Sequence, residues 1–247
     1  MNIDYNQLLK KIKTIWDSIH KFSWKAPDIG ISKQWLTEYD ITIERQLCKF
    51  IKSIDNKAVF FAEEEYENIA KKSDNLRIID PISNTFNFIH WLPHYSICVS
   101  HMVFWEVLFA VVYDPSSEEL FYAEKWKWAY LNWKRIHVSN NKTDLSIIIN
   151  HRKGLDITKL IENFYMMWTI RSIGSLGIHY AYVACGRAEC AITLPKDIFP
   201  EMAWKLLVEE AWWKFTDFNW NSISLETKSI IASNTLVHEI ILNKLKK

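Results

Sequence analysis

Acidic side chains follow two short apolar runs in the first third of the chain. Glu63 and Glu64 come directly after the run 58–61, and Asp80 comes directly after the run 78–79. Runs of β-branched and aromatic residues are typical of buried strands, and ligands bind at the carboxyl ends of strands in α/β folds. Carboxylates that meet there suit a hard, oxygen-binding cation such as Mg²⁺. The pattern predicts a metal site, with a solvated acidic turn as the plainer alternative.

The elements that position these acids alternate along the whole chain. Apolar spacing predicts an amphipathic helix at about 4–22 and a second helix from about 40 to 53, before the two strands. An antiparallel meander is expected over 95–131, with turns at Trp105 and 115–117. Further strands are expected at 145–150, 171–175, 188–193, 214–217 and 229–232, and helices at 155–167, 178–185, 201–211 and 235–246.

Composition excludes several classes of protein. The chain has 247 residues and a formal net charge of +1, so no strong field favours nucleic acid or a membrane surface. No apolar run approaches the roughly 20 residues of a membrane-spanning helix, and the four cysteines form no close pair. We expect one cytoplasmic domain over 1–247, with lobes of about 1–145 and 146–247.

The motif Asp80-Pro81-Ile82-x-x-Thr85-x-Asn87-Phe88 resembles the Asp-Pro-Ile-Asp-Gly-Thr-x-Asn-Phe signature of the inositol monophosphatase family. Glu63-Glu64 is similar to that family's Glu-Glu pair, and further similarity covers nearly the whole chain, including 111–115, 171–175 and 206–211. The resemblance implies an α+β fold, a layered αβαβα sandwich with its site between the lobes. It also implies Mg²⁺-assisted hydrolysis of a small sugar or polyol phosphate, commonly by a homodimer, for which the aromatic segment 86–104 is a candidate interface.

The resemblance assigns the metal and water positions residue by residue. Glu63, Asp80 and the backbone carbonyl of Ile82 match the first metal site, and Glu64 matches a carboxylate behind it or at a third metal. Asp40 matches the aspartate that orients the attacking water together with a threonine.

That threonine is Thr85, so Asp40, Glu64 and Thr85 form the expected catalytic set. Asp40 also suits an ordinary helix N-cap, which is the alternative for it. The positions expected to face the phosphate or the rest of the substrate are Ser83, Asn84, Thr85 and Ser175. His90, His94 and His101 show no metal-ligand spacing, and we expect them to be structural or solvent-facing.

The chain departs from the family pattern at the second metal. Ser83 and Asn84 stand where the motif has aspartate and glycine, and Phe199-Pro200 stands where the family has Trp-Asp. Proline cannot supply a side-chain ligand, although it suits the first turn of a helix. Thr193 replaces a glutamate that contacts inositol hydroxyls in the family. Asp197 and Glu201 are candidate replacements for the lost metal ligand.

Three interpretations remain open at this point. The chain is an active phosphatase with altered metals, or a relative that keeps the fold and binds a phosphorylated ligand or a protein partner. The third is a structural protein with a fortuitous acidic turn.

The composition is unusual in glycine and tryptophan. The chain has 5 Gly and 13 Trp, whereas about 7% Gly, or roughly 17 residues, is average for this length. Many tryptophans fall where turns require glycine, which alone adopts positive φ without strain. We hypothesise that the source organism reads UGA as glycine, against genuine tryptophan or an engineered chain as alternatives. Trp24 and Trp35 are weaker candidates than the nine main positions, Trp91, Trp105, Trp126, Trp128, Trp133, Trp204, Trp212, Trp213 and Trp220.

Overall fold

The structure, a computed structural model, describes most of the chain. The described residues are 4–19, 26–30, 35–65, 73–151, 153–195, 198–212, 214–224 and 226–245, with side chains left out at 198–200 and 202–203. The predicted replacement ligand Asp197 therefore lies outside the described residues.

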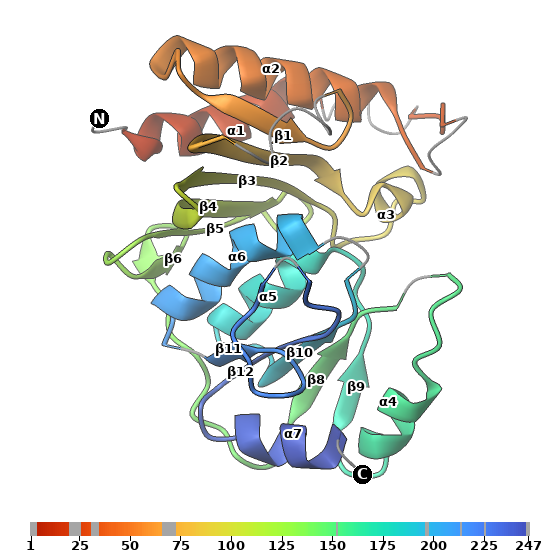
Figure 1. Ribbon diagram of the computed structural model, residues 1–247. Helices are drawn as coiled ribbons and strands as arrows, with labels where there is room; N and C mark the ends of the chain where they lie inside the picture. The colour runs from red at the N-terminus through yellow and green to blue at the C-terminus, as the bar shows by residue number, and fades with distance from the viewer. Residues whose placement is uncertain are drawn as a thin grey trace.

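Five layers follow one another along the molecule (Figure 1). Helices α1 (Tyr5–Ile19) and α2 (Glu38–Ile54) cover the outer face of a first sheet. Helices α5 (Leu176–Ala184) and α6 (Ile198–Glu210) lie between this sheet and a second one. Helices α4 (Thr158–Phe164) and α7 (His238–Leu245) pack on the outer face of the second sheet. The predicted αβαβα sandwich is confirmed.

Over the described residues, the first sheet has seven strands in the order β1-β2-β3-β4-β5-β6-β7. The pair β1–β2 is parallel, and β2 to β7 pair antiparallel, with β3 to β6 forming the predicted meander. The strands are β1 (Val59–Ala62), β2 (Asn75–Ser83), β3 (Ser96–Val103), β4 (Glu106–Asp114), β5 (Glu119–Glu124), β6 (Ala129–Leu131) and β7 (Lys134–Arg135).

The second sheet has five strands among the described residues, in the order β11-β12-β10-β8-β9. Both sheets have helices on both faces, so their central strands are buried throughout, as β10 and β12 are. The strands are β8 (Ser146–Ile149), β9 (Thr169–Arg171), β10 (Cys190–Thr193), β11 (Lys214–Thr216) and β12 (Ile230–Ser233).

Local sequence explains the helices that cover the first sheet. In α1, the buried residues recur at helical spacing, so one apolar stripe faces the sheet. Its buried side chains are Leu8, Leu9, Ile12, Ile15, Trp16 and Ile19. Helix α2 begins after Thr37, whose hydroxyl caps it, and Asp40 is the third helical residue of a capping box. The expectation that Asp40 itself is the N-cap is therefore wrong by three residues.

Two other expectations need correction. Strand β2 does not end at Asp80 but continues through Pro81 to Ser83, with a bulge between Asp80 and Ser83. Proline is tolerated at such a bulge because the ladder is already interrupted there. The short helix α3 (Thr85–Ile89) was not among the helices predicted from apolar spacing, since five residues rich in aromatics carry no helical period, although a helix start at Thr85 was expected.

All four cysteines are free, three of them buried, as the sequence predicted. Among the described residues, no helix combines the length and apolar character needed to cross a membrane.

Among the described residues, eight tryptophans have a left-handed backbone, with φ between 60° and 74°. Seven belong to the nine main positions, and the eighth is Trp35. Trp213 and Trp24 lie outside the described residues. Trp204 differs from the others because it lies inside α6 and is 3% exposed. The seven are Trp91, Trp105, Trp126, Trp128, Trp133, Trp212 and Trp220.

Replacing Trp126 by glycine should stabilise the protein. Trp126 is 84% exposed at φ 66°, and a left-handed L residue costs about 1–2 kcal/mol. We expect Trp126→Gly to raise the melting temperature by a few degrees, since ~1 kcal/mol corresponds to about 2–4 °C at this size. The matched control, Trp204→Gly, empties a buried site and should lose about 3 kcal/mol or more. Thermal melts in which both variants lose the same stability would contradict this interpretation.

Candidate functional site

One carboxylate lies just after β1, and a second lies on β2 at the start of its bulge. In the parallel register Ala62 pairs with Ile79, so the next residues along each strand are Glu63 and Asp80. Burial raises the pKa of the Cys98 thiol, and the negative charges of Asp80 and Glu63 raise it further. Both acids therefore lie near one buried sulfur, on a common side of the sheet.

The turn that carries Glu63 and Glu64 is held by a buried carboxylate. The Glu44 side chain is fully buried in α2. Its two oxygens accept the backbone N–H groups of Glu64 and Glu65, both at 2.8 Å. Burial raises the pKa of Glu44 more than these hydrogen bonds lower it.

Glu44 was not predicted as a site residue. A signal was available, because Asp40 and Glu44 are four residues apart in an amphipathic helix, on its buried face. Two acids on such a face call for specific partners.

The aspartate and threonine expected to orient the attacking water are in contact. Thr85 Oγ lies 3.0 Å from Asp40 Oδ1 and 3.0 Å from the carbonyl oxygen of Ile82. A hydroxyl has one hydrogen, so it donates to one of these acceptors at a time. Asp40 Oδ2 accepts the Thr37 N–H at 2.8 Å. The structure brings together Asp40, Thr85 and Ile82, while the catalytic role of the first two stays a prediction.

The expected substrate residues lie where the two lobes meet. Ser83 is buried at the end of β2, and Asn84 follows it at φ 69°. A Cβ added at Gly174 would lie 1.9 Å from Asn84 Nδ2, so only glycine lets the asparagine approach this closely. Ser175 precedes α5, is buried, and lies 2.7 Å from Ser96, hydroxyl to hydroxyl.

A cavity of about 780 Å³ opens beside these residues. Asn84, Asn87 and Gly174 line its inner part, and its other polar lining residues are His94, His151, Lys153 and Ser172. No carboxylate is among its lining residues in the part of the chain that the structure describes. The cavity therefore offers hydrogen-bond donors and positive charge, which suit an anionic ligand.

The described residues include no group of three or more His, Cys, Asp or Glu arranged to hold a metal. Two carboxylates and the Ile82 carbonyl are the oxygen donors at the edge of β1 and β2. Because Mg²⁺ keeps several waters and binds through one or two carboxylates, this donor set fits a single ion.

The described residues supply no replacement carboxylate for the second half of the expected metal site, and Asp197 lies outside them. Pro200 lies in the first turn of α6, as predicted, and Thr193 is buried. Glu201 does not replace the lost ligand here. Its carboxylate accepts hydrogen bonds from the Tyr180 hydroxyl and, at 3.1 Å, from the Thr193 hydroxyl, inside the second lobe.

Comparison with known proteins gives one consistent result. A family model described as the inositol monophosphatase family matches residues 12–247. The fructose-1,6-bisphosphatase/inositol-1-monophosphatase of Thermotoga maritima is 33% identical over 221 residues, 87% of this chain and 86% of its own length. The Nus factor SuhB of Pseudomonas aeruginosa is 27% identical over 244 residues, 94% of this chain and 90% of its own. A solved structure of a Thermotoga maritima IMPase superposes with a TM-score of 0.89 at 28% identity, covering 98% of this chain and 96% of the other.

Glu44→Gln should loosen the acidic turn. Glutamine has one acceptor oxygen, so one of the two backbone N–H groups loses its partner, which costs about 1–3 kcal/mol when buried. We expect urea denaturation to show this loss as a lower free energy of unfolding. We also expect the variant to bind Mg²⁺ more weakly. Glu65→Gln is the control, because its pair with Arg45 is partly exposed and such pairs contribute less than about 1 kcal/mol. Equal effects of the two changes would contradict the role of Glu44.

Glu201 should make stability depend on pH. Burial raises its pKa to about 7, against the lowering effect of the hydrogen bonds from Tyr180 and Thr193. The folded state then binds more protons than the unfolded state between the two pKa values. Stability should fall as pH rises from about 4.5 to above 7, by up to roughly 1.4 kcal/mol per unit. The free energy of unfolding of Glu201→Gln should not show this fall with pH. Identical pH slopes in the wild type and the variant would rule out the role of Glu201.

Proposed function

Because the chain belongs to the inositol monophosphatase family, we propose that it is a Mg²⁺-dependent phosphate monoester hydrolase acting on a small sugar or polyol phosphate. The observation that carries the proposal is the hydrogen bond between Thr85 and Asp40. This hydrogen bond lies beside Glu63 and Asp80. The pair proposed to orient water and the pair proposed to bind the metal would therefore be neighbours.

The residues present divide the chemistry between them. Glu63, Asp80 and the Ile82 carbonyl would hold one Mg²⁺, which lowers the pKa of water and polarises a phosphoryl oxygen when bound. Thr85, by donating its hydrogen to Asp40, keeps its oxygen lone pairs free to accept a hydrogen bond from the attacking water and so to orient it. Glu64, on the turn fixed by Glu44, would act as the neighbouring base.

The cavity supports a phosphorylated substrate other than inositol phosphate. Ser83, Asn84 and Ser175 would face the phosphate. Thr193 stands at the position where the family has a glutamate that contacts inositol hydroxyls. Its hydroxyl already donates a hydrogen bond to Glu201. Lys153 instead brings a positive charge to the cavity, which His151 also lines.

A catalytically impaired relative that binds a phosphorylated ligand or a protein partner is the second candidate. The loss of carboxylates at Ser83 and Pro200 favours it. One similar protein is named a Nus factor rather than a phosphatase.

We also propose a cytoplasmic homodimer with two lobes, about 1–145 and 146–247. Four free cysteines fit a reducing compartment. The segment 86–104 exposes a group of apolar side chains that suits an interface, namely Phe86, Leu92 and Phe104.

We propose further that glycine occupies the left-handed tryptophan positions in the native protein, because its organism reads UGA as glycine. Bulky side chains at positive φ are strained, and eight tryptophans share this backbone. Trp204 lacks this support. The intact mass of the protein from its native host should show fewer than thirteen tryptophans, whereas a mass that matches all 13 would contradict the recoding.

Phosphate release tests the proposed function. With glycine at the seven main left-handed positions, we expect release from sugar or polyol monophosphates that depends on Mg²⁺. Asp80→Asn should lower it by about a hundredfold or more, since metal assistance contributes several kcal/mol. Asp74→Asn, an exposed acid near the start of the same strand, is the control. No release by the folded protein would favour the ligand-binding alternative.

A further inference from the structure

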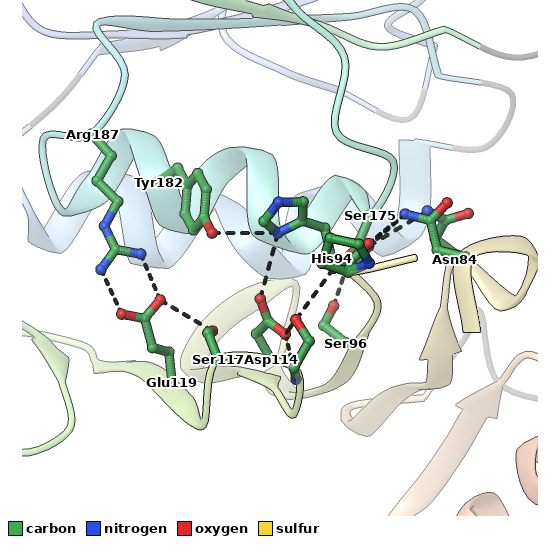
Figure 2. Close-up of polar contacts among 12 residues, drawn as sticks. Asn84, His94, Ser96, Asp114, Ser117, Glu119, Ser175, Tyr182 and Arg187 are labelled. Atoms are coloured by element: carbon green, nitrogen blue, oxygen red, sulfur yellow. Dashed lines mark hydrogen bonds and ion pairs between the residues drawn. The ribbon is translucent and has the colours of Figure 1, made fainter. Parts of the chain in front are cut away.

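One carbonyl oxygen joins the two lobes beside the cavity. The carbonyl of His94 accepts the side-chain amides of Asn84 and Asn87, at 3.5 and 3.4 Å, and the backbone N–H of Ser175 at 3.4 Å. The asparagines belong to α3 and the residue before it, whereas Ser175 begins α5 in the other lobe (Figure 2). The position of this oxygen therefore sets the distance between the two segments proposed to face the phosphate.

The His94 imidazole anchors that carbonyl from the other side. Nδ1 lies 3.4 Å from the Tyr182 hydroxyl and 3.7 Å from Asp114 Oδ2. The ring packs edge-on against Tyr182, with centroids 5.7 Å apart, and the backbone N–H donates to Ser116 Oγ at 3.3 Å. These contacts hold His94 at φ 66°, a conformation that costs about 1–2 kcal/mol in an L residue.

The two side chains that contact the imidazole, Asp114 and Tyr182, are themselves held in place by other residues. Asp114 is fully buried. Although burial raises its pKa, the nearby His94 imidazole and the hydrogen bonds from Ser116 lower it further, so the pKa is lowered overall. The Arg187 guanidinium lies 4.9 Å from the Tyr182 ring centroid and pairs with Glu119 (Figure 2).

We propose that His94 is a positioning residue of this site, whose imidazole fixes the carbonyl that aligns Asn84 and Ser175 for the substrate phosphate. The predicted change in KM rests on the proposed function, whereas the predicted change in amide exchange at Ser175 does not. His94 makes no contribution to bond breaking. The residues around His94 in the sequence do not indicate this role, because its contacts to Ser175 and Tyr182 join segments that are far apart in the chain.

Two substitutions at His94 separate the imidazole from the backbone. His94→Gly keeps the left-handed backbone and removes the side chain. His94→Asn tolerates the same φ and places an amide where Nδ1 stands, so it should rescue the contacts. His90→Gly is the control, because His90 is an exposed histidine of the same connection that gains the same backbone freedom.

The readouts are amide hydrogen exchange at Ser175 and steady-state kinetics with a sugar monophosphate. In His94→Gly we expect faster exchange at Ser175 and a KM raised by about tenfold, with kcat changed much less. His94→Asn and His90→Gly should stay close to wild type in both readouts.

Other outcomes separate the two proposals. Unchanged exchange at Ser175 in His94→Gly would overturn the positioning role, and so would faster exchange with an unchanged KM. If wild type releases no phosphate but Ser175 still exchanges faster in His94→Gly and is restored in His94→Asn, the proposed phosphatase function fails. The anchoring of Ser175 by His94 would then stand alone.

Discussion

The buried carboxylate of Asp40 is the constraint on which the candidate site depends. It is fully buried and binds Thr37 at the start of α2 and Thr85 at the start of α3. A buried charge without partners would cost several kcal/mol, so these two segments must stay together. One turn later in α2, Glu44 holds the turn after β1 in the same way. One helix thus holds the turn that carries Glu63 and the start of α3, which follows the strand that carries Asp80.

The two halves of the site differ in charge as a consequence of a few residues. The first lobe keeps its carboxylates at the ends of β1 and β2. Pro200 and Thr193 stand where the resemblance to the family motif predicts acids, and the nearby Glu201 accepts a hydrogen bond from Tyr180. The cavity between the lobes has basic residues and amides in its lining. This asymmetry argues for one bound cation and for a substrate held largely through its anionic groups.

Much of the fold could be predicted from local pattern. The helical period gave α1 and α2, and alternation with clear turns gave the meander from β3 to β6, because each pattern is set by residues close in sequence. The N-cap of α2 was misplaced because Thr37 and Asp40 are both good capping residues and only the structure shows which side chain bonds which N–H. Helix α3 is too short to show a period.

The candidate site could be predicted only where a motif carries it. In the parallel register of β1 and β2, Ala62 pairs with Ile79, so Glu63 and Asp80 each follow a paired residue, while their metal-binding role stays a prediction. Glu44 and His94 were missed because their roles arise from contacts between distant segments, which no local spacing encodes. The tryptophan positions, in contrast, could be predicted from local sequence. Turn chemistry alone indicated a left-handed backbone at seven sites, and the structure has it at all seven.

Counting bound ions tests the central claim most directly. Mn²⁺ prefers the same oxygen ligands as Mg²⁺, and its free-ion electron paramagnetic resonance signal reports how many ions each chain binds. Retention of only the first half of the metal site predicts one ion per chain, lost in Asp80→Asn. Two ions per chain, or one that persists in Asp80→Asn, would contradict that claim.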